Sequence, residues 1–126
     1  MERGRFMTNP FLDNRKRLFE NKVGFVIEDK FAVSKGHLLI VPHRVYSNYF
    51  ESSKKELDGF NELILLGKNY LQEKYSPDGF NVGINCGEHA GQTINHTHIH
   101  LIPRYKGDVD DPRGGVRGVI PSEQKY

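Results

Sequence analysis

Three histidines alternate with other residues in one short stretch, and this spacing limits what the stretch can fold into. His96, His98 and His100 make up half of the six histidines in the sequence. Alternate residues of a β-strand point to one face, so the spacing predicts a strand that carries a row of imidazoles. The apolar Ile99 and Leu101 would then face a core, which places the histidines in a cleft or at the surface.

The row has three explanations. A structural or solvated role is ordinary for one histidine, but a buried imidazole needs partners for two ring nitrogens, which makes three of them costly. In a zinc site, His96 and His100 would lie roughly 13 Å apart along the strand, and no fourth ligand is evident. Catalysis by histidine is the third explanation. The preceding Gly91-Gln92-Thr93 turn offers N–H groups to an anion, which a metal site would not need.

The middle histidine of the row suits nucleophilic catalysis. A neutral imidazole can attack an α-phosphorus at physiological pH, which divides one hydrolysis into two displacements through a phosphoramidate. The attacking ring must present an unprotonated Nε2, and a hydrogen bond from its Nδ1–H to a backbone carbonyl would fix that tautomer. His98 has an imidazole on either side that can contact phosphate oxygens and a leaving group.

Two sequence blocks carry a resemblance to a known family. The segment His96-Thr97-His98-Ile99-His100-Leu101-Ile102 resembles the His-φ-His-φ-His-φ-φ signature (φ apolar) of the histidine triad family of nucleotide hydrolases and transferases, with Thr97 as the one departure. The flanking Gly91-Gln92-Thr93 and Pro103-Arg104 are similar to the diadenosine polyphosphate hydrolase branch. Gly36-His37-Leu38-Leu39-Ile40-Val41-Pro42 resembles the family's second block.

The resemblance implies a role for each matching residue. His98 corresponds to the nucleophile, His100 to a contact with phosphate and leaving group, His96 to a supporting histidine and His37 to the histidine that completes the site. Five more positions match substrate-binding residues of the family: Gln92, Thr93 and Asn85 for phosphate, Asp29 for the ribose hydroxyls and Ile27 for the base pocket. For Asp29, an ordinary turn residue after a strand is the alternative.

The function that follows is a nucleoside phosphate hydrolase or nucleotidyl transferase acting at the α-phosphate through a nucleotidyl-histidine. Dinucleoside polyphosphates are the first expected substrates, and nucleoside phosphoramidates or adenylyl conjugates are the alternative. A nucleotide-binding protein with incidental turnover belongs to a different class, and the intact histidine set disfavours it. No cofactor is expected to be required, although a divalent cation such as Mg²⁺ can accompany a polyphosphate substrate.

Composition indicates an ordinary single domain. The chain has 126 residues, a mass of 14.5 kDa and a formal charge of +2, so a homodimer could help to complete its core. Because no apolar run approaches membrane-spanning length and no signal peptide is evident, we expect a cytoplasmic protein without a membrane partner. The charge argues neither for nor against nucleic acid, and we expect no nucleic-acid partner. The single Cys86 excludes an internal disulfide. Asn9-Pro10-Phe11-Leu12 stands where some relatives have a zinc-binding Cys-x-x-Cys, so we expect no structural zinc.

The expected fold is α+β: an antiparallel sheet of about five strands with one main helix and a short N-terminal helix. Ser53 and Glu56 are spaced as a capping box for the main helix, whose Leu57, Phe60, Ile64 and Leu71 should face the core. The expected elements are a short helix over 13–21, the main helix over 53–75, and strands over 22–28, 37–41, 80–85 and 94–102.

Both ends of the chain are expected to lie outside the compact domain. Residues 1–9 read as a flexible basic leader, and residues 106–126 as an extended tail that crosses a surface such as that of a partner subunit. Arg113 and Arg117 lie among glycines in this tail. One of them could reach phosphates beyond the α position, and a solvated tail is the alternative.

Overall fold

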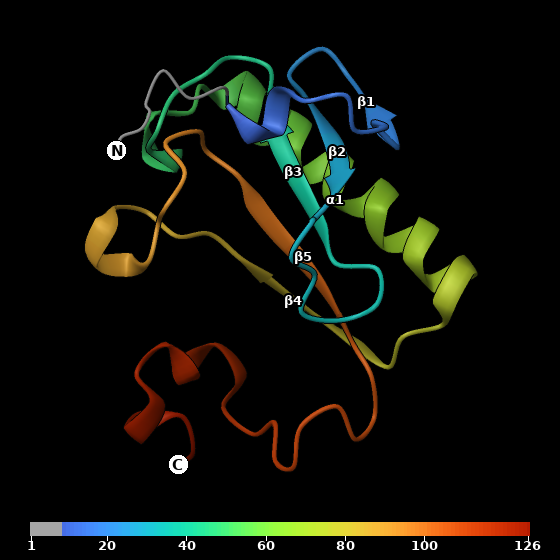
Figure 1. Ribbon diagram of the computed structural model, residues 1–126, viewed down its shortest axis with the longest axis vertical. Helices are drawn as coiled ribbons and strands as arrows, with labels where there is room; N and C mark the ends of the chain where they lie inside the picture. Colours follow the sequence, from blue (N-terminus) through green and yellow to red (C-terminus); the bar gives the residue numbers. More distant parts are fainter. Residues whose placement is uncertain (1–8) are drawn as a thin grey trace.

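One antiparallel sheet and one long helix form the body of the protein. The computed structural model describes residues 9–126, and the strands lie in the order β1-β2-β3-β5-β4. The strands are β1 (Phe19–Glu20), β2 (Gly24–Glu28), β3 (Leu38–Pro42), β4 (Gly79–Gly83) and β5 (Ile99–Arg104). Helix α1 (Lys54–Tyr75) crosses one face of the sheet (Figure 1). The α+β prediction, with its five strands and single main helix, is confirmed.

Helix α1 begins with the predicted capping box. The Glu56 N–H donates to Ser53 Oγ at 3.0 Å, and the Ser53 N–H donates to Glu56 Oε1 at 2.8 Å, which satisfies two free donors of the first turn. The helix packs Phe60, Leu63 and Leu71 onto the sheet. Leu57, expected in the core, is instead 39% exposed.

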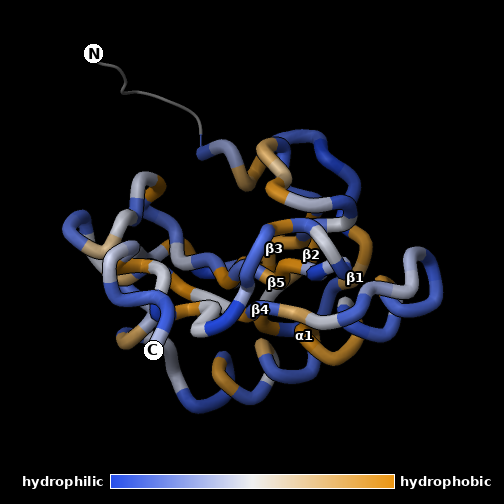
Figure 2. The backbone as a smooth tube through the Cα atoms, turned by 90° about the horizontal axis from the view of Figure 1, so that it is seen from below, coloured by the Kyte–Doolittle hydropathy of each residue, from blue (hydrophilic) through white to orange (hydrophobic). Residues whose placement is uncertain are grey.

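Alternation along the strands divides the apolar residues between the two faces of the sheet. On the helix side, Val26, Leu38, Ile40, Ile99 and Leu101 form one core with α1. On the opposite side, Phe25, Ile27, Leu39 and Val41 form a second cluster, which is covered by Phe11 from the N-terminal segment. Figure 2 shows the central strands as the apolar middle of the molecule. The histidine row belongs to the second, more thinly covered face.

The turn from β2 to β3 positions the second histidine block. Gly36 has φ +92°, a conformation that side-chain-bearing residues rarely adopt, and a Cβ there would lie 2.7 Å from Leu71 Cδ2 on α1. Ser34 Oγ donates to the Pro103 carbonyl at 2.7 Å, which ties the turn to the end of β5. The turn is therefore held by α1 and by the end of β5 immediately before His37.

The short helix predicted over residues 13–21 is wrong. A 3₁₀ helix, Pro10–Leu12, precedes this region, and the region itself ends in the extended strand β1. Phe19 and Glu20 pair with Val26 and Phe25 on β2. The Arg15 guanidinium donates to the Pro10 and Glu28 carbonyls. Pairing with β2 thus overrides a helical preference that was only local.

The C-terminal tail folds back beyond β4 (Figure 1, red). It contains two 3₁₀ helices, Gly115–Val119 and Pro121–Glu123, the first of which contacts β4. The tail is therefore more ordered than the extended segment expected. Of the predicted flexible leader, residues 1–8 lie outside the described residues. Within residues 9–126, no helix has the length and apolar character needed to cross a membrane.

Candidate active site

The histidine row enters the sheet only at its last member. The predicted strand over 94–102 is shorter at its start, because the ladder of β5 begins at Ile99. Ahead of it, the Tyr46 carbonyl accepts both the Thr97 N–H at 2.7 Å and the Thr97 hydroxyl at 2.8 Å. These two bonds hold the segment extended, which keeps His98 and His100 on one face.

His98 is held in a single tautomer. Its Nδ1 lies 2.8 Å from the His96 carbonyl oxygen, which only accepts hydrogen bonds, so Nδ1 carries the proton and Nε2 carries the lone pair. The ring packs at 4.8 Å between centroids against Phe11. His98 is 8% exposed and lines a small pocket. This contact is the carbonyl hydrogen bond that a nucleophilic histidine needs.

His96 lies behind His98 in the core of the protein. The whole row was expected to lie in a cleft, but His96 is buried. The ring is fully buried, and its Nε2 donates to the Pro42 carbonyl at 2.8 Å. Asn9 Nδ2 donates to His96 Nδ1 at 2.8 Å. Burial lowers the pKa of His96, which keeps the ring neutral. Both ring nitrogens are therefore occupied, and His96 acts on the site through its carbonyl, which binds His98.

His37 sets the tautomer of His100 through a chain of three groups. The Val33 N–H donates to His37 Nδ1 at 3.1 Å, so His37 carries its proton on Nε2. The His37 Nε2–H donates to His100 Nδ1 at 2.9 Å. Asp29 Oδ2 lies 3.3 Å from His37 Nε2. His100 must then carry its own proton on Nε2. The chain leaves His100 as a hydrogen-bond donor beside the lone pair of His98.

The electrostatics keep His100 neutral. Burial, followed by the neighbouring His98 and His37, lowers the pKa of His100 to about 4, against an opposing effect of Asp29. Burial also lowers the pKa of His37. His37 and His100 are therefore neutral at neutral pH, and His100 offers an imidazole N–H to the pocket.

The pocket beside these rings has a volume of about 210 Å³. Three of the predicted substrate-binding residues, Asn85, Thr93 and Asp29, line it together with His98 and His100. Four apolar residues of the lining and the tip glycine of the preceding loop were not predicted: Phe11, Phe31, Leu39, Ile94 and Gly91. Phe31 is 86% exposed although it is a large apolar residue, which is visible only in the structure.

Two predicted binding residues lie elsewhere. Ile27 is 1% exposed within the second core cluster and does not line the pocket, because β2 is covered there by Phe11. Gln92 uses its whole amide on the backbone: Nε2 donates to the Ser47 and Ile94 carbonyls at 2.7 and 3.0 Å, and Oε1 accepts from the Gly87 N–H at 2.9 Å. In this structure Gln92 shapes the loop before the row and makes no side-chain contribution to the pocket.

The tail arginines do not line the pocket either. Arg113 lies 3.6 Å from the Asp111 carboxylate, and Arg117 stacks on the Tyr126 ring while its Nε donates to the Glu123 carbonyl. The contact of a tail arginine with substrate phosphates stays a prediction.

One group of side chains has the spacing of a metal site, at a place the sequence did not indicate. Ligand atoms of Asp29, His37 and His100 all lie within 4.8 Å of one another. A neutral histidine that binds a metal through Nε2 carries its proton on Nδ1 and donates it to an acceptor. His37 Nδ1 instead faces the donating Val33 N–H. The group therefore suits a hydrogen-bond chain better than a metal ion.

The Asn9–His96 hydrogen bond lies in the Asn9-Pro10-Phe11-Leu12 segment, for which no structural zinc is expected. Asn9 donates to the histidine nitrogen directly, and its Oδ1 accepts the Phe11 N–H at 3.0 Å. An amide thus provides the contact through which the N-terminal segment is fixed to the histidine row.

Comparisons with known proteins identify relatives of this chain. A bis(5'-adenosyl)-triphosphatase of Dictyostelium discoideum is 31% identical over 106 residues, which cover 81% of this chain and 69% of that protein. An uncharacterized HIT-like protein of Methanocaldococcus jannaschii is 41% identical over 75 residues, which cover 60% of this chain. They cover 57% of that relative, so this chain spans less than two thirds of its length.

A solved structure shows the same fold. The crystal structure of a HIT family protein from Bacillus anthracis superimposes with a TM-score of 0.71 at 31% identity, covering 75% of this chain and 67% of that chain. The HIT domain family itself matches residues 13–107, a range that contains both histidine blocks and every strand of the sheet. With the histidine triad, the sheet and this match in agreement, the chain belongs to the HIT domain family.

Proposed function

We propose that this protein is a nucleotide hydrolase that transfers a nucleotidyl group from the α-phosphate of its substrate to His98 and then to water. The observation that carries the proposal is the hydrogen bond from His98 Nδ1 to the His96 carbonyl, which leaves the Nε2 lone pair at a pocket. A lone pair held in this way can attack phosphorus without first losing a proton.

The first displacement uses the two tautomers together. The His98 Nε2 lone pair forms a bond to the α-phosphorus as the bond from phosphorus to the leaving group breaks. The electron pair of that bond goes to the leaving atom, where the His100 Nε2–H can donate to the developing negative charge. His98 becomes a nucleotidyl-imidazolium, and the His96 carbonyl accepts the Nδ1–H throughout.

The second displacement regenerates the enzyme. Water attacks the same phosphorus, the P–N bond breaks, and its electron pair returns to His98 Nε2. The attacking water releases its proton to solvent. Two successive displacements retain configuration at phosphorus, whereas direct attack by water would invert it.

The pocket suits a nucleoside. Phe11, Phe31 and Leu39 offer apolar surface to a base, and Asp29 is an acceptor for hydroxyls. Asn85 and Thr93 line the same pocket, next to the loop that precedes the histidine row. Their side chains would contact a phosphate of the substrate there. In the proposed complex, Gln92 acts by holding that loop through its three backbone contacts.

Dinucleoside polyphosphates are the proposed substrates, because a relative with 31% identity over most of this chain is named a bis(5'-adenosyl)-triphosphatase. Mg²⁺ would enter with the polyphosphate. Nucleoside phosphoramidates and adenylyl conjugates are the alternative class, since His98 attacks the same phosphorus in each.

A homodimer is also proposed, and the surface that supports it is the helix side of the edge strand β4. Helix α1 lies over the other strands and leaves Val82 46% exposed. Leu65 and Leu66 on α1 are 53% and 40% exposed. The edge strand of the sheet, beside exposed apolar side chains, fits a second copy of the sheet.

Rapid quenching with substrate labelled at the α-phosphorus tests the covalent step. Label should appear on the protein within the first turnover, be stable in base and be lost in acid, as expected for a P–N bond. Inversion of configuration in a chiral-phosphorus substrate would exclude the nucleotidyl-histidine. A panel of dinucleoside polyphosphates, phosphoramidates and adenylylated compounds then ranks the substrate classes by kcat/KM.

A further inference from the structure

The peptide group between His96 and Thr97 carries two of the contacts that hold the histidine row. Its carbonyl accepts the His98 Nδ1–H at 2.8 Å, and its N–H donates to the Tyr46 carbonyl at 2.7 Å. Because a peptide group is planar, its N–H and its carbonyl turn together. A shift of the Tyr46 carbonyl would therefore turn the carbonyl that fixes the tautomer and the direction of the His98 ring.

The side chains around Tyr46 face the start of helix α1. Arg44 makes a bidentate ion pair with Glu56: its Nε donates to one carboxylate oxygen at 3.1 Å, and a terminal nitrogen donates to the other at 2.7 Å. The same terminal nitrogen donates to the Glu51 carbonyl at 3.1 Å. The guanidinium lies 4.0 Å from the centre of the Tyr46 ring, whose hydroxyl lies 2.6 Å from Ser52 Oγ. These contacts tie this stretch of backbone to the segment that leads into the helix.

Glu56 has a charge that its role in the helix cap does not require. Its side chain is 9% exposed, and the hydrogen bonds from Arg44 lower the pKa of Glu56 against the opposing effect of burial. A capping box needs only the oxygen that accepts the Ser53 N–H, and glutamine serves in that position as well as glutamate. The second oxygen accepts from Arg44. The charge of Glu56 therefore serves the contact with Arg44.

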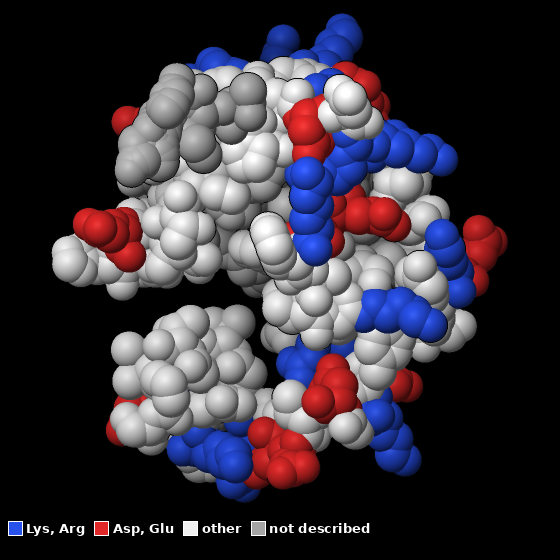
Figure 3. Space-filling view, viewed as in Figure 1, with Lys and Arg blue, Asp and Glu red and all other residues white. Residues whose placement is uncertain are grey.

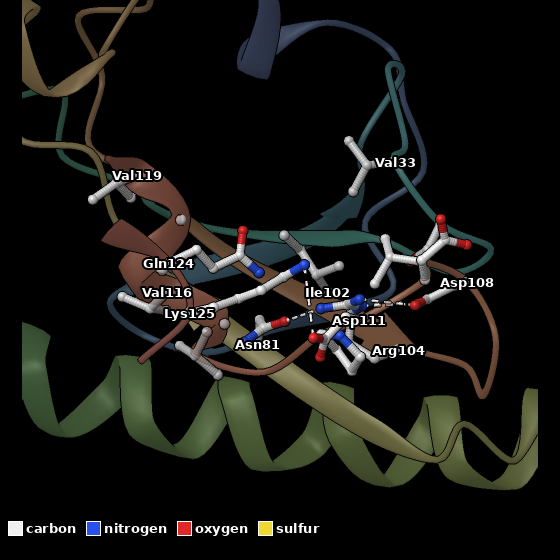
Figure 4. A pocket seen from close by; sticks show the side chains of 18 residues that line it. Val33, Asn81, Ile102, Arg104, Asp108, Asp111, Val116, Val119, Gln124 and Lys125 are labelled. Atoms are coloured by element: carbon white, nitrogen blue, oxygen red, sulfur yellow. Dashed lines mark hydrogen bonds and ion pairs between the residues drawn. The ribbon is translucent and has the colours of Figure 1, made fainter. Parts of the chain in front are cut away.

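A second bidentate ion pair lies at the end of β5 and provides a comparison. The Arg104 Nε and one terminal nitrogen donate to the two Asp108 carboxylate oxygens at 2.8 Å each, and the other terminal nitrogen donates to Asn81 Oδ1 at 2.7 Å (Figure 4). This pair lines a groove of about 720 Å³ between the sheet and the C-terminal tail, which Figure 3 shows as a slot. Within residues 9–126, no side-chain hydrogen bond of either partner reaches a histidine.

On the basis of the proposed function, we infer that Arg44 and Glu56 are positioning residues for nucleotidyl transfer to His98, although neither lines the pocket. Their ion pair holds the Tyr46 carbonyl in place. That carbonyl holds the peptide group after His96, which in turn directs the His98 lone pair at the α-phosphorus. Misplacement of a reacting group by about 1 Å can cost on the order of a hundredfold in rate.

Glu56→Gln tests the inference, because it keeps the helix cap and removes the charged half of the ion pair. With a dinucleoside triphosphate labelled at the α-phosphorus and at saturating concentration, the rate of label transfer to the protein should fall about ten- to a hundredfold. Affinity for adenosine monophosphate, measured by calorimetry, should change by less than about twofold, because the pocket residues lie on other segments.

Two changes at Arg44 test the same contact from the other side. Arg44→Lys keeps the charge but not the bidentate geometry, so its transfer rate should lie between those of the wild type and Glu56→Gln. The double variant Arg44→Met/Glu56→Gln should transfer label no more slowly than Arg44→Met, because both changes break one contact. Independent roles for the two residues would instead multiply the two losses of rate.

Two control variants separate positioning from general loosening of the fold. Asp108→Asn removes the carboxylate of the comparison ion pair and should transfer label at the wild-type rate. Ser53→Ala weakens the same start of α1 but leaves both Glu56 oxygens to Arg44. It should lower the unfolding temperature without slowing transfer. Thermal unfolding establishes that each variant is fully folded at the assay temperature.

The outcomes distinguish the inference from the proposed function. A wild-type transfer rate in Glu56→Gln, or in Arg44→Lys if Glu56→Gln does not fold, would overturn the inference and leave the proposed function standing. A comparable loss of rate in Ser53→Ala or Asp108→Asn would also overturn the inference, because the effect would then not depend on the Arg44–Glu56 contact. Absence of label on the wild-type protein would overturn the proposed function, and the inference with it.

Discussion

Replacing Asn9 by Ala should destabilise the protein far more than the loss of one surface asparagine, because its amide has two buried partners. Asn9 Oδ1 accepts the Phe11 N–H at 3.0 Å, and Nδ2 donates to His96 Nδ1 at 2.8 Å. Loss of a capping side chain costs about 1 kcal/mol. Leaving the fully buried His96 nitrogen without a donor adds about 1–3 kcal/mol, since water cannot replace it. The expected total is about 2–4 kcal/mol.

Asn48→Ala is the matched control. Asn48 caps another short 3₁₀ helix through the Phe50 N–H at 2.8 Å, and no other side-chain contact of this amide is present within residues 9–126. Its loss should therefore cost only the capping contribution of about 1 kcal/mol. Urea unfolding of both variants at neutral pH gives the two free energies. If Asn9→Ala is no more destabilising than Asn48→Ala, the Asn9–His96 contact does not support the histidine row.

Asn9→Asp separates the two losses by pH. The carboxylate keeps the capping acceptor but cannot donate to His96 Nδ1, so His96 must take up a proton to pair with it. The folded-state pKa of His96, lowered by burial in the wild type, would be raised in this variant. A raised histidine pKa adds stability that is present below the unfolded value of 6.5 and is lost as pH rises. Asn9→Asp should exceed Asn9→Ala in stability at about pH 6 and lose that advantage above the new pKa.

Three further predictions address catalysis, acid stability and assembly. His98→Ala should lower kcat on the order of a thousandfold or more while nucleotide binding by calorimetry persists; equal loss of both would argue against a nucleophile. Because burial lowers the pKa of His100 from 6.5 to about 4, the unfolded chain binds a proton first, and stability should fall by up to about 3 kcal/mol from pH 6.5 to 4. His100→Asn should flatten this slope in urea unfolding, and an unchanged slope would contradict the assignment. Sedimentation at micromolar concentration should report about twice 14.5 kDa. Val82→Asp should give monomers, whereas the control Val33→Asp, on the β2–β3 turn, should remain dimeric. A fully active wild-type monomer would refute the dimer.

The sequence predicted those parts of the fold that depend on local patterns. Alternation at 96–102 indicated which side of β5 carries the histidines, and the Ser53–Glu56 spacing located the start of α1 correctly. Continuous apolar runs gave β2 and β3 within two residues of their observed bounds. Each of these signals lies within one element, so no knowledge of the partner element was needed.

The remaining features depend on contacts between distant segments. The 13–21 region becomes extended because β2 offers a pairing edge, which no local preference reveals. The buried His96 receives the donor for its Nδ1 from Asn9, 87 residues earlier in the chain. Gln92 turns away from the pocket because the Ser47 carbonyl lies within reach of its amide. Motif matching identifies the residue type in such cases, while the surrounding fold decides which atoms remain free.

The tautomers of the four clustered histidines also provide a spectroscopic signature. In ¹⁵N spectra, a protonated ring nitrogen and one that bears a lone pair resonate far apart, so each ring reports where its proton resides. His98 alone should show its protonated nitrogen at Nδ1, whereas His96, His37 and His100 should show theirs at Nε2. Formation of a covalent intermediate would remove the lone-pair signal of His98 and leave its Nδ1 proton in place, so the resting enzyme and the intermediate could be told apart in solution.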